Sequence, residues 1–229
     1  AAVARARRAS PTYVVIGPWV SLFEIYSQLR GLERSLMDLA EAPAFVDAVL
    51  DRVEAIQTGM MQRFFPRVAG HLDLVFISDD LGGQQSLLMS PRMWERHLQP
   101  RLKRWCDLVH DHGLRVFYHT DGAVRPLLKH ILDCGVDVLN PIQHACPGMD
   151  MGELKREFGG RVIFHGGVDN QTVLPRGTVD DVRAEVRECL RTLGAGQEGL
   201  ICCSCHNVQA GTPIENIVAM VETVRQSEA

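Results

Sequence analysis

Short apolar runs alternate along the chain with longer amphipathic segments. The runs are rich in β-branched and aromatic residues and are nearly continuous, which is typical of strands buried on both faces. Because amphipathic segments separate them and no hairpin signal joins them, the pattern predicts parallel βα units. The six predicted strands are Tyr13–Ile16, Leu72–Ile77, Val116–Tyr118, Val136–Leu139, Val162–Phe164 and Gly199–Cys202.

Start and stop signals for helices bound the segments between these runs. Ser90 and Pro91 supply an N-cap and a first-turn proline for one helix, which is expected to run as far as Gly113. A second helix is predicted over residues 178–193, with aspartates in its first turn and a glycine after its last residue. A third helix is predicted over residues 43–65. Its inward face is expected to carry Phe45, Val49, Val53 and Ile56.

Six βα units predict an α/β fold. A doubly wound sheet would be expected to show a glycine-rich phosphate-binding turn after a strand, and none of the six runs is followed by one. A parallel (β/α)8 barrel of the TIM type needs eight strands. We therefore expect such a barrel without its first one or two βα units, with residues 1–229 forming a single domain because no linker divides them.

Composition narrows the class of protein. Hydrophobic residues make up 46% and charged residues 23% of the 229-residue chain, as in soluble globular proteins. The net charge of −4 argues against general binding to nucleic acid or to a membrane surface, and no apolar run is long enough to span a membrane. The basic residues of Ala4–Arg8 are interpreted as a solvated terminus. Seven cysteines, an odd number, indicate reduced thiols and a cytoplasmic location.

Polar and ionisable side chains gather just after the predicted strands. The carboxyl ends of parallel strands carry the functional residues of α/β folds, whereas the opposite loops here hold mostly turn residues, and this asymmetry indicates an enzyme. Asp79 and Asp80 are adjacent, so we expect one to serve as a turn or cap residue and Asp80 to act as a base or substrate contact. The predicted catalytic residues are Asp80, His119, Asp121 and His206. The predicted substrate contacts are Trp19, Gln143, His165, Asp169 and Asn207.

His119 and Asp121 are separated by one residue at a strand end, so both side chains can point the same way. With Cys205 or His206 from the last strand as a third ligand, they would form a three-ligand site with an open position, as in catalytic zinc enzymes. Cys205 is the third ligand that we predict. The alternative is that His119 bonds within its own loop and Asp121 caps the next helix. His165 has a similar alternative, as a hydrogen-bonded histidine inside the barrel.

Five groups of residues follow one another along the chain as recognisable motifs. They are Asp79–Gly82 followed by Ser90-Pro91, then Phe117–Gly122, Gly166–Asp169, His206–Gln209 and Thr212–Asn216. In these motifs, and above all in their order, the sequence from about Tyr13 to its C-terminus resembles the uroporphyrinogen decarboxylase superfamily. That superfamily contains porphyrinogen decarboxylases, which need no metal, and zinc-dependent methyltransferases that act with corrinoid proteins.

The resemblance is closer to the methyltransferase-like members, which carry a His-x-Cys pair and a later cysteine. His119 matches the histidine of that pair, Asp121 replaces its cysteine, and Cys205 or His206 stands near the later cysteine. What this implies is a metal-dependent transfer of a methyl group between a corrinoid protein and a thiol or other small acceptor. It also implies Zn²⁺, a methyl-corrinoid carried by a partner protein, a small-molecule substrate and a homodimer. An oxygen ligand in place of sulfur makes the metal site harder.

Two other functions are open. Decarboxylation of a polycarboxylate such as a tetrapyrrole would need several arginines converging on the substrate, and the predicted strand ends offer none. Arg125, the nearest arginine to one of them, is expected to lie on the following helix. A non-catalytic barrel fragment is the remaining alternative. An Arg-x-x-x-Arg loop upstream of the chain would favour decarboxylation.

Overall fold

The computed structural model describes residues 14–68, 70–196 and 199–227, so Tyr13 and the basic segment Ala4–Arg8 lie outside it. The chain forms two compact units. Of the described residues, the N-terminal unit holds those up to 80, with 88–119 and 126–137, and the C-terminal unit holds 81–87, 120–125 and those from 138 onward. Each unit is described by itself below.

Three parallel strands form the sheet of the N-terminal unit. β1 pairs with β2, and β2 pairs with β3 in a regular register from Leu74 opposite Arg115 to Ser78 opposite His119. Val75, Ile77 and Val116 are fully buried in this sheet, which explains the continuous apolar runs. The elements are β1 (Ile16–Val20), α2 (Phe23–Arg30), α3 (Leu32–Glu41), α4 (Pro43–Val68), β2 (Leu74–Ser78), α5 (Pro91–His97), α6 (Gln99–Asp111), β3 (Arg115–His119) and α7 (Arg125–Asp133).

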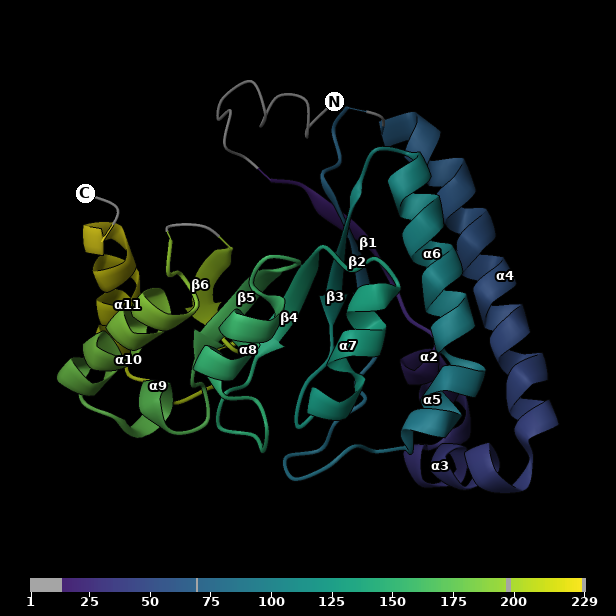
Figure 1. Cartoon of the computed structure of the whole chain (residues 1–229), viewed down its shortest axis with the longest axis horizontal. Helices are drawn as coiled ribbons and strands as arrows, with labels where there is room; N and C mark the ends of the chain where they lie inside the picture. Colours follow the sequence, from purple (N-terminus) through teal and green to yellow (C-terminus); the bar gives the residue numbers. More distant parts are fainter. Residues whose placement is uncertain (1–13, 69, 197–198, 228–229) are drawn as a thin grey trace. The chain divides into compact units, whose positions relative to one another are not determined.

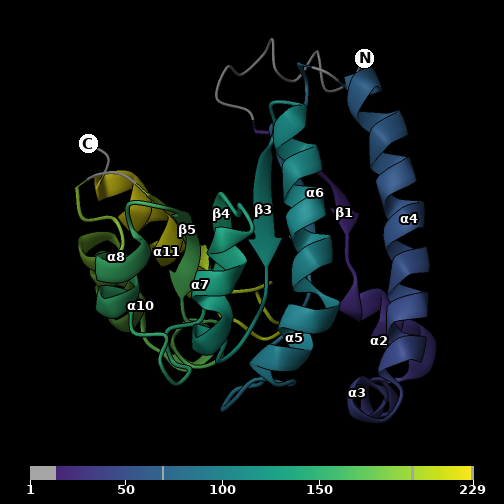
Figure 2. The same cartoon turned by 45° about the vertical axis from the view of Figure 1, so that its right-hand side comes forward.

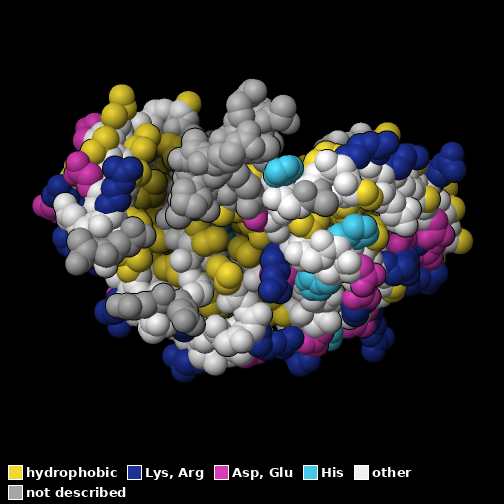
Figure 3. Space-filling model, turned by 90° about the horizontal axis from the view of Figure 1, so that it is seen from above, with side chains coloured by type: hydrophobic (Ala, Val, Ile, Leu, Met, Phe, Trp, Pro, Cys, Tyr) yellow, Lys and Arg dark blue, Asp and Glu magenta, His cyan; other side chains and the backbone are white. Residues whose placement is uncertain are grey.

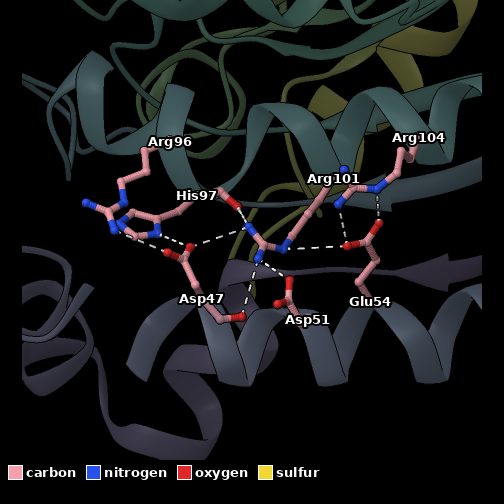
Figure 4. A network of polar contacts seen from close by, with 7 residues as sticks. All are labelled: Asp47, Asp51, Glu54, Arg96, His97, Arg101 and Arg104. Atoms are coloured by element: carbon pink, nitrogen blue, oxygen red, sulfur yellow. Dashed lines mark hydrogen bonds and ion pairs between the residues drawn. The ribbon is translucent and has the colours of Figure 1, made fainter. Parts of the chain in front are cut away.

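Helices α4 and α6 run side by side in this unit (Figures 1 and 2), where Trp105 Nε1 donates to Thr58 Oγ1 over 2.9 Å. A charged network joins α4 to α5 and α6 (Figure 4). At its centre Arg101, with 7% of its side chain exposed, pairs with Asp47, Asp51 and Glu54. Figure 3 shows basic and acidic side chains mixed over the surface seen from above. The network around Arg101 ties α4 to α5 and α6.

The C-terminal unit contains three further parallel strands, with β4 paired to β5 and β5 paired to β6. Helices α8, α10 and α11 lie around them (Figure 1). α10 begins with a capping box between Thr178 and Asp181 and buries Val182 and Val186. The elements are β4 (Val138–Ile142), α8 (Met151–Phe158), β5 (Ile163–Val168), α9 (Val173–Arg176), α10 (Val179–Thr192), β6 (Leu200–Ser204) and α11 (Ile214–Ser227).

The six predicted strands all exist, and the predicted α/β class with parallel strands is confirmed. Every strand nevertheless ends later than predicted, and all but β3 also begin later. As a result Trp19 and His165 lie within strands and not after them. The apolar run marks only the buried part of each strand, whereas backbone pairing continues into the polar residues that follow it.

Two helix predictions were wrong in detail. The helix predicted over 90–113 is two helices that meet at Leu98, because Pro100 in the first turn of α6 cannot continue the helix before it. In α4 the buried face carries Val46, Leu50, Val53, Gln57, Met61 and Phe65. Phe45 and Ile56, predicted to point inward, are 47% and 60% exposed. Among the described residues, no helix is both long and apolar enough to cross a membrane.

Candidate active site

Asp79 caps a helix from a neighbouring strand. It follows β2, and its carboxylate accepts hydrogen bonds from Ser21 Oγ at 2.9 Å and from the backbone N–H groups of Phe23 and Glu24 at 2.6 and 3.0 Å. Leu22 N donates to the same group. Burial raises the pKa of Asp79 to about 7, and the donors act in the opposite direction. The prediction that one of the two aspartates is a cap residue is confirmed for Asp79.

His119 and Asp80 lie together in the N-terminal unit. His119 is the last residue of β3, and its Nε2 atom is 3.5 Å from Asp80 Oδ1. The His119 side chain is 12% exposed, and its ring lies 5.9 Å from that of Phe76 between centroids. The Asp80 side chain is 45% exposed. A carboxylate at this distance can orient the imidazole, while Asp79 next to it is turned away toward α2.

Asp121 and His206 meet in the C-terminal unit. His206 Nε2 is 3.7 Å from Asp121 Oδ2, and the two side chains are 38% and 27% exposed. Asp121 lies in the loop that precedes α7, and His206 lies in the loop after β6. The structure thus brings together two residues that are 85 positions apart in the chain (206 − 121) and that were both predicted to be catalytic.

The loop that carries Asp121 is held by close backbone contacts. A Cβ atom on Gly82 would lie 2.5 Å from the Asp121 carbonyl oxygen, and one on Gly122 would lie 2.5 Å from the Gly83 carbonyl oxygen. Gly122 also has a φ of +88°, which favours glycine. Gln143, 7% exposed, accepts a hydrogen bond from Gly122 N over 3.0 Å. Gln143 therefore positions the loop of Asp121, whatever contact it makes with a substrate.

A pocket of about 720 Å³ in the C-terminal unit contains both Asp121 and His206. Gln143 and Cys205, two other predicted site residues, also line it. Half of the remaining lining residues carry a polar, uncharged side chain, which suits a small hydrophilic ligand. The lining residues are Gln84, Asp121, Gln143, Asn170, Gln171, Pro175, Arg176, Cys205, His206, Gln209, Ala210 and Gly211.

Several lining residues escaped the sequence prediction. Gln84, Asn170, Gln171, Arg176 and Gln209 come from loops and from the four-residue helix α9 and do not follow a strand directly. Gln209 belongs to the motif His206–Gln209, whereas the others are marked in the sequence only by the polar character of their segments. Strand ends indicate the residues nearest the sheet, and these residues lie further from it.

Cys205 and Cys203 differ from what a catalytic thiolate requires. Cys205 Sγ donates to the Ile142 carbonyl oxygen over 3.1 Å, and burial raises the pKa of Cys205 to about 12. Cys203 Sγ lies 3.4 Å from His165 Nδ1, which is also 2.8 Å from Asn140 Nδ2. Burial raises the pKa of Cys203 to about 11. Both thiols thus act as hydrogen-bonding groups, and His165 has polar partners within its own unit.

The remaining predicted contacts lie elsewhere. Asp169 accepts from Gln171 N over 2.7 Å and so shapes the start of α9. Asn207 is exposed, and its carbonyl oxygen accepts from Gln209 Nε2 over 2.8 Å. Trp19 lies in β1 and is 44% exposed. None of these three lines the pocket just described, and their roles as substrate contacts stay predictions.

The chemistry of the Asp121 and His206 pair suits a metal ion. Two ligands at about 2.0–2.2 Å from a tetrahedral Zn²⁺ are roughly 3.4 Å apart, close to the 3.7 Å between His206 Nε2 and Asp121 Oδ2. Both side chains are open enough to receive an ion from solvent. One imidazole and one carboxylate also form a donor set that divalent zinc accepts.

The comparisons with known proteins agree with this description. The family model for uroporphyrinogen decarboxylase (URO-D) matches residues 1–227. A methyltransferase from Methanosarcina mazei has a similar structure, with a TM-score of 0.74 and 24% identity over 100% of this chain and 63% of that chain. A dihydropteroate synthase from Anaplasma phagocytophilum reaches a TM-score of 0.50 at 13% identity, over 94% of this chain and 74% of that one. No curated protein matches in sequence.

At these identities the structural likeness establishes the fold alone. It confirms the predicted class, an α/β fold of the parallel (β/α) barrel type, of which the described residues form six strands. The chain spans 63% of the length of the methyltransferase, so the activity of a whole relative does not transfer to it directly. The family match covers nearly every residue, and the chain belongs to the uroporphyrinogen decarboxylase (URO-D) family, as its motifs predicted.

Proposed function

We propose that the protein is a metal-dependent methyltransferase of the URO-D family, which transfers a methyl group between a corrinoid protein and a thiol or other small acceptor. The observation that carries this proposal is the pairing of His206 with Asp121 in a polar pocket. Family membership and a methyltransferase of similar fold support it. We place the protein in the cytoplasm, where its free thiols would stay reduced.

The proposed metal ligands are Asp121 and His206 of the C-terminal unit, with His119 as the further ligand that the sequence predicts. His119 is separated from Asp121 by a single residue, so the chain itself keeps their Cα atoms within about 7 Å of each other. Cys205, the third ligand predicted from the sequence, is a weaker candidate than His206 because its thiol is buried against the Ile142 carbonyl group. A bound Zn²⁺ would supply Lewis acidity and lower the pKa of an acceptor thiol.

The protein's own residues then orient the reactants. Asp80, 3.5 Å from His119 Nε2, would hold the imidazole in one orientation, as carboxylates do for metal-binding histidines. Gln143 and the contact between Gly82 and Gly122 would fix the backbone of Asp121. In the transfer itself, a new S–CH₃ bond forms as the Co–CH₃ bond breaks. The corrinoid cobalt keeps the electron pair, and the thiol proton is released to solvent.

The pocket favours this reaction over decarboxylation of a polycarboxylate. A substrate with several carboxylates would need several cationic side chains, whereas Arg176 is the one arginine or lysine among the described residues that line the pocket. This agrees with the lack of arginines at the predicted strand ends.

A direct assay mixes the zinc-loaded protein with methylcobalamin and a small thiol without oxygen, and follows the visible spectrum of the cobalamin. The proposal predicts demethylation in proportion to the protein, with loss of at least 90% of the rate in Asp121→Ala and His206→Ala. Asp180→Ala, a change on the exposed face of α10, is the control and should keep the full rate. No protein-dependent demethylation with any thiol or with a native corrinoid protein would overturn the proposal.

A further inference from the structure

One positively charged side chain, that of Arg176, lines the pocket of the C-terminal unit. Arg176, the last residue of α9, is exposed and lines the pocket together with Asp121 and His206. Within the described part of the chain, its guanidinium group has no hydrogen bond or ion pair. Other arginines of the same unit are paired, as Arg125 is with Glu157 and Arg191 with Glu188. Asp121 also lines this pocket, but no ion pair links it or another carboxylate of the described residues to Arg176, and such a guanidinium group is suited to an anionic ligand.

The backbone under Arg176 is held firmly. Asn216 of α11, only 1% exposed, donates from Nδ2 to the carbonyl oxygens of Leu174 and Gly177 over 2.9 and 2.8 Å. Leu174 is fully buried, and Asp169 bonds the N–H group of Gln171 at the start of the same turn. α9 is therefore fixed on both sides of Arg176, which is the support that a binding residue needs and a solvated chain end lacks.

The rest of the pocket limits the kind of ligand. Gln84, Gln143, Asn170, Gln171 and Gln209 offer neutral donors and acceptors. One cation and several carboxamides suit a small polar molecule with a single negative charge better than a polyanion or an apolar compound.

We propose that Arg176 determines specificity by binding a carboxylate of the small-molecule substrate, whose thiol or methyl-bearing end faces Asp121 and His206. The substrate class is then a small, singly anionic thiol or methylated compound. This inference rests on the proposed function for the identity of the reacting end. The binding of the carboxylate by Arg176 rests on the pocket alone. The proposed methyl transfer and the proposed anion site can therefore fail separately.

The test compares two thiols of equal length, 3-mercaptopropionate and 3-mercapto-1-propanol, by calorimetric titration of the zinc-loaded protein. We expect the carboxylate to bind about fivefold more tightly, a modest preference because Arg176 is exposed and its charge is screened by solvent. The preference should shrink as salt is raised. It should vanish in Arg176→Gln and survive in part in Arg176→Lys. Arg183→Gln, an exposed arginine of α10 outside the pocket, is the matched control and should keep it.

Equal binding of both thiols by the unchanged protein, or the same preference in Arg176→Gln, would overturn the role of Arg176 and leave the methyltransferase proposal standing. If neither thiol binds, the proposed thiol chemistry has failed. A titration with propionate, in which binding is measured from the NMR line widths of the ligand, then tests whether Arg176 binds an anion. Weaker binding of propionate to Arg176→Gln than to the unchanged protein supports it, and equal binding overturns it.

Discussion

The carboxylate of Asp79 offers a sharp test of how the end of β2 is built. In Asp79→Ala, the hydroxyl of Ser21 and the N–H groups of Leu22, Phe23 and Glu24 lose their shared acceptor. These four groups are buried or partly buried, so water replaces the carboxylate poorly. Loss of a helix cap costs about 1 kcal/mol, and a buried donor left without its acceptor costs about 1–3 kcal/mol. Because several donors share this carboxylate, we expect a total loss of about 3–4 kcal/mol.

The assay is urea unfolding at about pH 8, followed by far-UV circular dichroism. Ser21→Ala removes only one of the donors and should cost about 1 kcal/mol. Asp79→Asn keeps one acceptor oxygen and should fall between the two. The reasoning is refuted if Asp79→Ala unfolds within about 1 kcal/mol of the unchanged protein, because the carboxylate would then not be the group that satisfies the start of α2.

Other predictions concern the site loops. Gly82→Ala places a methyl group 2.5 Å from the Asp121 carbonyl oxygen and should cost about 1–3 kcal/mol of stability and weaken metal binding. In Gly160→Ala, where no atom lies within 4 Å of the added methyl group, stability and metal binding should both stay unchanged. Equal melting temperatures for the two variants would contradict the close contact at Gly82. The hydrogen bond that His144 Nε2 donates to the Glu185 carboxylate raises the pKa of His144 above 6.5. The stabilising pair is therefore fully present below about pH 6.5 and is lost as the pH rises through the raised value. Urea unfolding of the unchanged protein and of Glu185→Gln from pH 5.5 to 8.5 checks this. The difference between their free energies of unfolding should become smaller as the pH rises, and a constant or growing difference would exclude the pair.

Much of the fold could be predicted because each strand is a continuous apolar run. The residue that follows such a run is harder to assign. His119 proved to be the last residue of β3, whereas His165 proved to lie inside β5, since pairing with β6 continues as far as Val168. Hydrophobic residues indicate which part of a strand is buried. The end of the strand depends instead on backbone hydrogen bonds, which polar residues form equally well.

The wrong face of α4 has a similar cause. Gln57 is polar but occupies a buried position, because its amide accepts from Ser21 N over 3.0 Å and donates to the Ser21 carbonyl oxygen. If Gln57 is counted as exposed, the predicted buried face is rotated by one residue, about 100° around the helix axis. That rotation places Phe45 and Ile56 on the inward face. Arg176 escaped prediction for another reason, because its place in the pocket depends on Asn216, which is 40 residues further along the chain (216 − 176).

The metal content of the purified protein tests the central claim most directly. Mass spectrometry of the metals bound to the unchanged protein, after dialysis against zinc and then against buffer, should find about one zinc ion per chain. Asp121→Ala and His206→Ala should retain less than a tenth of that amount, whereas Cys205→Ser should retain nearly all of it. Absence of zinc from the unchanged protein, or loss of zinc in Cys205→Ser but not in His206→Ala, would contradict the proposed site.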